Sequence, residues 1–152
     1  FYRSNKVKIF ISLLFLLMIS ITIIFIQQKR EKNNILIAEK YIQAVVNLSQ
    51  NKESEAKNLL SEIILSENKF YSILALNKII EKNLFDNDEK ILEYFNKLEN
   101  LDFNEEELDL LIFKKALFLL KTSKKIEGNN LLERLIKKDS KFKDLAEETI
   151  FN

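Results

Sequence analysis

The chain has 152 residues and a formal net charge of +1, and it contains neither cysteine nor histidine. These absences exclude disulfides, thiolate chemistry, cysteine-based zinc sites and histidine as a general base. With no proline and a single glycine, Gly128, the composition favours an all-helical chain over a many-stranded sheet, which would need turn residues.

The first predicted element is an apolar run over residues 9–26 that contains no charge, proline or glycine. As a helix at about 1.5 Å per residue it spans roughly 27 Å, close to the ~30 Å hydrocarbon core of a bilayer. We therefore predict a transmembrane helix. A cleaved signal peptide would have a shorter apolar core followed by a small-residue cleavage site. A buried soluble helix would need a larger surrounding domain.

Basic residues flank the apolar run on both sides, where lysine and arginine meet lipid headgroups. They are Arg3, Lys6, Lys8, Lys29, Arg30 and Lys32, with Glu31 as the one opposing charge. Because the two sides carry equal numbers, the positive-inside rule leaves the orientation undecided. The rest of the chain has more acidic than basic residues, which argues against a nucleic-acid-binding domain. Since the chain starts with Phe1, we expect residues 1–8 to be a tail whose natural beginning is missing.

Beyond the run, apolar residues recur at helical spacing in consecutive segments. We predict helices over residues 33–50, 53–66, 69–84, 88–100, 105–122, 125–138 and 141–151. No helix breaker separates residues 26 and 35, so the anchor can continue through a juxtamembrane joint, residues 27–34, into a helical domain at 35–152.

Several of these helices begin with capping signals. Asp86 precedes Glu89 by three residues, and Asn104 precedes Glu107 by three, as in capping boxes. Asp139 or Ser140 is expected to cap the last helix.

Alternate helices resemble one another. Residues 56–63, 91–98 and 128–135 align with offsets of 35 and 37, the length of one helix-turn-helix repeat. Small Ala56 and Gly128 fall where neighbouring helices would approach closely. We predict an α-solenoid of about three helical hairpins and a capping helix, with an irregular bundle as the alternative.

The third hairpin begins with a segment that is apolar around most of its circumference, residues 108–120, and we expect this segment at the centre of the domain. Four apolar residues of the last helix are expected to cover its open side. They are Phe142, Leu145, Ile150 and Phe151.

Two acidic clusters contain groups that could carry chemistry. Asp86, Asp88 and Glu89 resemble the start of a calcium loop, but Lys90 stands at the third ligand position, so a helix cap is preferred. The carboxylates of residues 105–109 suit an acid–base pair, yet first-turn acids are explained by the helix dipole. We therefore expect no catalytic residue, no metal and no cofactor, and keep a carboxylate hydrolase as a minor hypothesis.

What remains is surface for binding proteins. Helical arrays present grooves lined by one helix of each hairpin, and Tyr41, Tyr71 and Phe113 are the candidates to contact an extended or helical client. Each is equally suited to the core.

The anchor is followed by EKYIQAVVNLSQNKESEAKNLLSEI, FYSILALNKIIEK and a closing DSKFKDLAEETI. Together these segments resemble the bitopic inner-membrane tetratricopeptide-like family that includes the YfgM-type ancillary subunit of the Sec translocon. The chain departs from that family in lacking proline at the ends of repeats. The resemblance implies a cytoplasmic N-terminal tail, a periplasmic TPR-like array, and partners among the Sec translocon, periplasmic chaperones or exported clients.

We therefore expect an all-α chain in which an N-terminal transmembrane helix precedes a TPR-like α-solenoid. The leading hypothesis is a single-pass inner-membrane scaffold that assists protein export or envelope protein folding on the periplasmic side. The alternative is a membrane-tethered adaptor or oligomerisation module that faces the cytoplasm.

Overall fold

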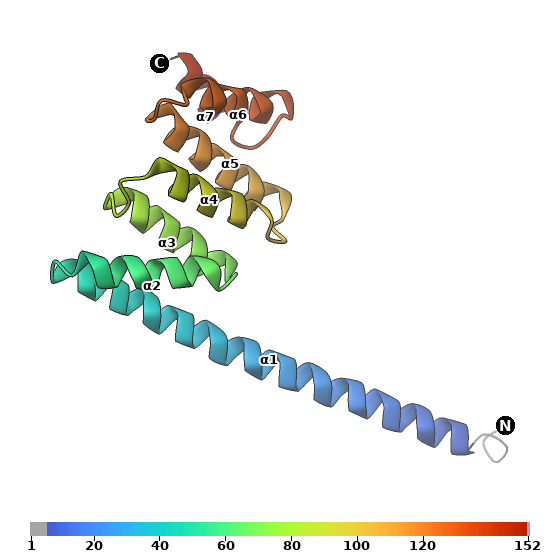
Figure 1. Ribbon diagram of the computed structural model, residues 1–152. Helices are drawn as coiled ribbons and strands as arrows, with labels where there is room; N and C mark the ends of the chain where they lie inside the picture. Colours follow the sequence, from blue (N-terminus) through green and yellow to red (C-terminus); the bar gives the residue numbers. More distant parts are fainter. Residues whose placement is uncertain (1–5, 152) are drawn as a thin grey trace. The chain divides into compact units, whose positions relative to one another are not determined.

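All regular structure in residues 6–151, the part of the chain that this computed structural model describes, is helical (Figure 1). The all-α prediction is thus confirmed for these residues, and the predicted tail at residues 1–8 lies mostly outside them. The helices are α1 (Lys6–Ser49), α2 (Glu53–Leu65), α3 (Lys69–Glu81), α4 (Asp88–Glu99), α5 (Glu105–Leu120), α6 (Lys125–Lys137) and α7 (Lys143–Phe151).

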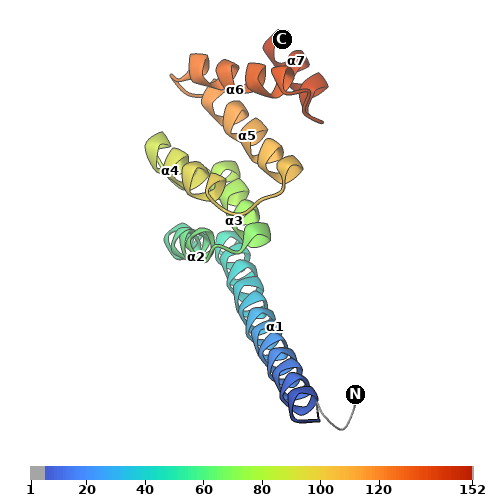
Figure 2. The same ribbon diagram turned by 90° about the vertical axis from the view of Figure 1, so that its right-hand side faces the viewer.

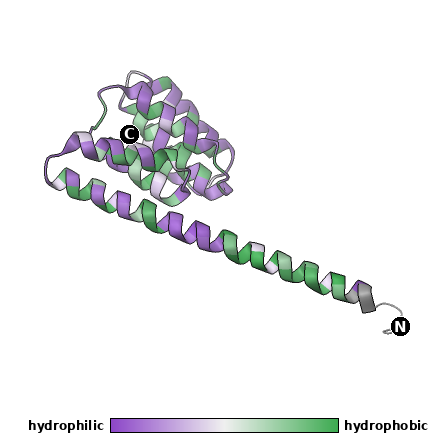
Figure 3. Cartoon of the chain, turned by 60° about the horizontal axis from the view of Figure 1, so that its bottom comes forward, coloured by the Kyte–Doolittle hydropathy of each residue, from purple (hydrophilic) through white to green (hydrophobic). Residues whose placement is uncertain are grey.

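The chain divides into two compact units, Phe1–Glu39 and Lys40–Asn152. In the first unit, every side chain of residues 10–26 is exposed, and α1 is the one helix of the described part that is long and apolar enough to cross a membrane (Figure 3). The hydroxyls of Ser20 and Thr22 donate to the carbonyls of Leu16 and Met18 at 3.0 and 2.9 Å. These bonds satisfy the only hydroxyl groups among the apolar residues that follow Ser12.

Residues 27–34, predicted as a juxtamembrane joint, are fully helical within α1. Neither proline nor glycine interrupts this stretch, so nothing in the sequence ends the helix before the turn at Gln50 and Asn51. Asn51 adopts a positive φ of 58°, the left-handed conformation that commonly ends a helix.

In the second unit, the helices pack mainly on their neighbours in sequence: α2 on α3, α3 on α4, α4 on α5, α5 on α6, and α6 on α7. The two ribbon views show α2 to α7 following one another in chain order (Figure 2). The starts of α2 to α6 agree with the sequence-based ranges, whereas the segment predicted to start at residue 33 is part of α1 and α7 begins at Lys143.

The aligned segments of alternate helices bury the same positions. In each segment the first, fifth and eighth residues are buried. They are Ala56, Leu60 and Ile63 on α2, Ile91, Phe95 and Leu98 on α4, and Gly128, Leu132 and Leu135 on α6. The spacing of 35 and 37 residues is therefore repeated in the burial pattern as well as in the sequence.

One predicted capping box is confirmed and one is wrong. The Asn104 side chain accepts from the Glu107 amide at 2.9 Å, and the Glu107 carboxylate accepts from the Asn104 amide at 3.0 Å. At α4 the cap is Asn87, whose side chain accepts from the Glu89 amide at 2.9 Å, and not Asp86. The shift by one residue arises because the amide oxygen of Asn87 reaches an N–H two residues on, which a three-residue spacing rule does not detect.

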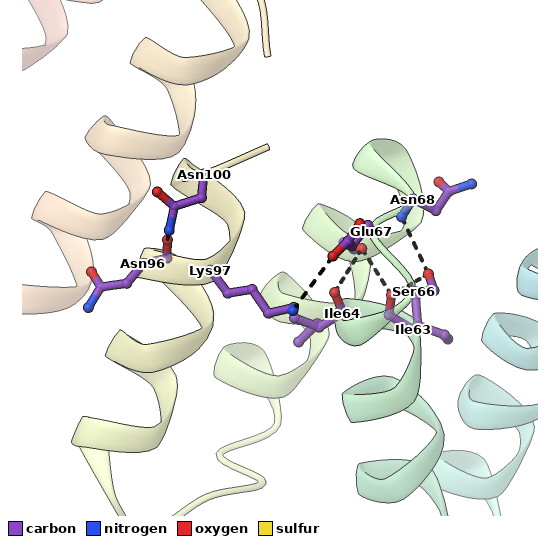
Figure 4. Close-up of polar contacts among 9 residues, drawn as sticks. Ile63, Ile64, Ser66, Glu67, Asn68, Asn96, Lys97 and Asn100 are labelled. Atoms are coloured by element: carbon purple, nitrogen blue, oxygen red, sulfur yellow. Dashed lines mark hydrogen bonds and ion pairs between the residues drawn. The ribbon is translucent and has the colours of Figure 1, made fainter. Parts of the chain in front are cut away.

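The helix connections contain no glycine, because Gly128, the one glycine of the chain, lies within α6. Positive φ values occur at Asn51, Glu67, Asn83 and Asp139, each within two residues of a helix end. At the α2–α3 turn, Ser66 Oγ donates to the Ile63 carbonyl at 2.7 Å, and Glu67 pairs with Lys97 of α4 at 3.9 Å (Figure 4). Polar side chains thus support turns where glycine would otherwise be preferred.

The last helix covers α5 differently from the prediction. Phe142 and Ile150 do contribute, the former stacking on Phe113 and the latter packing on the buried cluster that contains Ile112, Ala116 and Ala146. Leu145 and Phe151 were predicted to cover α5 and instead are exposed. The buried face of α7 is set by small Ala146, which allows α7 to lie close to its neighbours.

Gly128 lies where α6 closely approaches α5. A methyl group placed on it would lie 3.0 Å from the Ala116 carbonyl oxygen and 3.1 Å from a Leu120 side-chain carbon. The first of these neighbours is backbone, so a larger residue at Gly128 has to separate α5 from α6.

We therefore predict that Gly128→Val lowers the free energy of unfolding by about 1–3 kcal/mol, the usual cost of overpacking. The measurement is urea unfolding of the full chain in detergent, followed by circular dichroism. Asn129→Val, one residue further along α6 and exposed, is the matched control and should change stability by less than about 0.5 kcal/mol. Equal effects at both positions would contradict the close approach.

Candidate functional site

The aromatic side chains predicted to contact partners lie in two places. The rings of Tyr41 on α1 and Tyr71 on α3 are 6.0 Å apart and tilted by 49°. Phe70 meets Tyr71 edge-on at 5.1 Å. We call Tyr41, Phe70 and Tyr71 the aromatic group. Phe113 belongs to α5 and has no ring contact with this group.

Phe70 is the member that sequence reasoning missed. It is 65% exposed, whereas Tyr41 and Tyr71 are half-buried. The buried face of α3 is formed by Ser72 and by apolar residues three to seven positions after it. Phe70 lies about 200° around the helix from Ser72, at about 100° per residue, so its ring points away from the core. The sequence did contain a signal for Phe70: this large aromatic residue lies outside the helical period of the apolar residues.

The arrangement gives the aromatic group a supported and an open side. The two tyrosines pack between α1 and α3, while the Phe70 ring remains accessible to solvent. Aromatic rings held by neighbours in this way offer a large apolar contact area with little side-chain entropy to lose on binding. The group is therefore suited to contact an apolar side chain of another protein.

Phe113 has a different environment. Its ring stacks on Phe142 at 5.9 Å with an interplanar angle of 17°, and it packs against the buried cluster of α5, α6 and α7. Its contacts are with its own chain, and they attach the segment before α7 to α5. A partner-binding role for Phe113 stays a prediction.

The carboxylates weighed as an acid–base pair are each engaged elsewhere. Glu107 closes the capping box at the start of α5. Glu106 pairs with Lys141 at 2.5 Å. Glu105 and Asp109 both pair with Lys138, at 3.1 and 2.8 Å. These contacts join the first turns of α5 to the connection between α6 and α7.

Asp109 is the most buried acid of this group, with 3% of its surface exposed. It lines a cleft of about 420 Å³ together with Lys138, Ser140 and Lys141. The hydrogen bond to Asp109, followed by that to Glu105, raises the pKa of Lys138 above its ordinary value of 10.5. The arrangement keeps Lys138 charged and Asp109 paired, which suits a structural link between helices.

The acidic cluster of Asp86, Asp88 and Glu89 lies at the capped start of α4, so a helix-start role is confirmed although Asp86 is not the cap. Asn87 caps the helix, and Glu89 pairs with Lys124 at 2.5 Å. Within residues 6–151, no group of three or more acidic, histidine or cysteine side chains is placed to hold a metal ion.

No family model, curated protein or solved structure matches the chain. The resemblance to the YfgM-type family therefore stays a prediction. What bears on function is the distribution of side chains in the chain itself: the exposed apolar stretch of α1, the helical array and the aromatic group.

The Lys138 link yields a stability prediction. Lys138→Met leaves the Asp109 carboxylate buried without its cation, and we expect the free energy of unfolding to fall by about 1–3 kcal/mol at pH 7. The adjacent Lys137 pairs only with Glu133 on the same helix, at 3.4 Å. Lys137→Met is therefore the control and should change stability by less than about 0.5 kcal/mol.

The same pair predicts a pH dependence. Because folding raises the pKa of Lys138, its stabilising contribution is complete below pH 10.5 and is lost as the pH rises through the folded-state value. The stability difference between the wild type and Lys138→Met should therefore be constant near neutrality and shrink above pH 10.5. A difference that disappears on going from pH 7 to pH 9 would contradict this assignment.

Proposed function

We propose that the chain is a single-pass membrane-anchored scaffold for protein–protein interaction, whose helical array binds partner proteins next to the bilayer. The observation that carries this proposal is the composition of α1. One unbroken helix contains the exposed apolar residues 10–26 and, at its C-terminal end, Tyr41 and Ala44 of the array unit.

A bilayer accounts for the exposed residues better than water does. The side chains of Phe10, Phe15 and Phe25 are 65–69% exposed, and the apolar residues between them are similarly open. The backbone of this stretch is bonded within the helix, and both hydroxyls of Ser20 and Thr22 have acceptors. A segment with apolar side chains and satisfied polar groups meets the requirements of a lipid environment.

The array is proposed to be a TPR-like solenoid. Two features support this interpretation over an irregular bundle. The extensive helix contacts are all between consecutive helices, as in stacked repeats, and the three aligned segments bury equivalent positions. Gly128 lies close to the backbone of α5, as predicted, and Ala56 is fully buried.

The proposed mechanism is tethering without covalent chemistry. The aromatic group offers the surface, and the anchor confines it to the neighbourhood of the bilayer. Confinement raises the effective concentration of the array for partners that are also at the membrane, so that weak contacts suffice. An amphipathic helix or an extended segment with apolar side chains is the kind of ligand such a surface accepts.

The resemblance to the YfgM-type family favours a periplasmic array that assists the Sec translocon or periplasmic chaperones. The flanking charges do not decide the orientation, since the apolar stretch has basic residues at both ends. The competing proposal, a cytoplasm-facing adaptor, differs in the side of the membrane on which the array lies.

Membrane anchoring and orientation are tested together in bacterial cells that express the full chain. We expect the protein to stay with the membrane after alkaline carbonate extraction, and the array to be cut by protease added to intact spheroplasts. Protection until the inner membrane is opened would assign the array to the cytoplasm and contradict the periplasmic proposal.

Two matched double variants that change residues in the middle of the apolar stretch test the membrane anchor. Leu17→Arg with Ile21→Arg adds about 5–7 kcal/mol against insertion, while each apolar residue favours it by about 0.3–0.6 kcal/mol. Carbonate should therefore release most of this variant and little of the Leu17→Ala, Ile21→Ala control. Release of the wild-type chain would contradict anchoring itself.

Partner binding is tested by placing a photo-crosslinking amino acid at Phe70. In intact membranes we expect crosslinks to Sec components or periplasmic chaperones from Phe70, because its ring is 65% exposed beside two supporting tyrosines. The same probe at Phe113, which stacks on Phe142, is the comparison and should give at least several-fold less product. Crosslinks from Phe70 to cytosolic proteins alone would contradict the proposed partners.

A further inference from the structure

The helical turns after the apolar stretch carry a cationic face. Lys29, Arg30 and Lys32 follow Ile26 on α1. At about 100° per residue, Lys29 and Lys32 lie about 60° apart and Arg30 lies about 100° from Lys29. Glu31, the only acid in this stretch, lies about 200° from Lys29 and therefore on the opposite side. We call Lys29, Arg30 and Lys32 the juxtamembrane basic face.

The three cations differ from most lysines of the array. Lys124, Lys138 and Lys141 are each paired with a carboxylate of another helix. All three residues of the juxtamembrane basic face are exposed, and none of the ion pairs among residues 6–151 includes them. Their charges are thus available to an anion from outside the chain.

The face also continues the apolar surface of the anchor. The three cations line a hollow on the helix together with Phe25, Ile26 and Leu36. The colouring of α1 shows the change from the hydrophobic stretch to a hydrophilic band (Figure 3). A ligand that matches both properties is an amphiphile with an apolar chain and a negatively charged head.

The position along the helix agrees with this chemistry. Lys29 and Lys32 lie three and six residues beyond Ile26, or roughly 4.5 and 9 Å along the axis. The polar region of each leaflet is about 5–8 Å thick, so these side chains reach the depth of the lipid phosphates.

We propose that the juxtamembrane basic face is a binding site for the headgroup phosphates of anionic phospholipids. This inference rests on the membrane anchoring proposed above. Arg30 can hold two phosphate oxygens through its planar guanidinium, and Lys29 and Lys32 add point charges beside it. The site selects anionic over zwitterionic lipids in the leaflet that adjoins the array.

The test uses the full chain reconstituted in phosphatidylcholine vesicles that contain a trace of spin-labelled phosphatidylglycerol or spin-labelled phosphatidylcholine. The fraction of each probe immobilised by the protein gives the lipid preference. We expect the wild type to prefer phosphatidylglycerol at low ionic strength. Each cation contributes up to about a fivefold change. The triple variant Lys29→Gln, Arg30→Gln, Lys32→Gln should bring the preference close to unity.

Two controls test whether the lipid preference depends on the juxtamembrane basic face or only on the total charge of the chain. Lys52→Gln, Lys121→Gln, Lys125→Gln removes three exposed positive charges from the array and should retain the preference. The exchange Lys29→Glu with Glu31→Lys leaves the net charge unchanged but moves a negative charge onto the face, and should reduce the preference at least as much as loss of one cation. If the array variant loses the preference, or the exchange leaves it intact, the proposed site is wrong.

Further outcomes distinguish this inference from the proposals on which it rests. A chain that stays in the membrane after carbonate extraction but shows no lipid preference overturns the headgroup site alone. A chain that carbonate releases overturns the anchor and with it the site. Loss of the preference with inorganic phosphate, but not with chloride at equal ionic strength, would identify a site for free phosphate and overturn the lipid assignment.

Discussion

The dominant physical constraint on this chain is the apolar surface that α1 exposes over residues 10–26. Fourteen large apolar side chains in this stretch are 41–69% exposed. Removing such a side chain fully from water is worth about 1.5–3 kcal/mol, so the stretch as a whole represents on the order of 10–20 kcal/mol of unfavourable hydration. A domain of this size is stable by only about 5–15 kcal/mol. Transfer of this surface into an apolar environment would therefore contribute as much free energy as the folding of the rest of the chain.

Charge is distributed around that constraint in two different ways. In the array, several lysines are paired with acids of other helices, as in Lys115 of α5 with Glu99 of α4 at 2.7 Å, and others are paired within their own helix, as in Lys78 with Glu81 at 2.6 Å. Next to the apolar stretch, the cations of the juxtamembrane basic face have no acid on their own side of the helix. The net charge of the chain is near zero, but its two regions differ. Acidic side chains of the array compensate its lysines, whereas anions from outside the chain are needed to compensate the juxtamembrane basic face.

Sequence reasoning located the helices because apolar periodicity is a property of each segment alone. It failed where the outcome depends on neighbouring segments. Leu145 and Phe151 have the residue type of a buried face, yet the α7 backbone lies close enough to its neighbours that only Ala146 is buried there. Sequence reasoning missed Phe70 because apolar periodicity identifies residues on the buried face of a helix. It gives no weight to a large aromatic residue outside that face. The pairing of Asp109 with Lys138, 29 residues later, depends on how α6 ends and was equally inaccessible.

The sizes of the interface residues explain why the array is unevenly packed. The backbones of α2 and α3, and those of α5 and α6, run close together over more residues than that of α4 with either neighbour. Ala75 of α3 and Gly128 of α6 are small and buried, and Gly128 lies directly against α5.

α4 instead meets α5 through large rings, with Phe95 against Phe118 at 5.9 Å, while Tyr94 of α4 contacts Phe85 of the α3–α4 connection at 5.8 Å. Interaxial distance depends on the side chains at the contact, so the large rings of Phe95 and Phe118 favour a wider spacing between α4 and α5. In a stack stabilised mainly by nearest-neighbour contacts, differences between interfaces set where the array opens first. We therefore expect the α3–α4 and α4–α5 interfaces, where the backbones lie close together over fewer residues, to open more readily than the α2–α3 and α5–α6 interfaces.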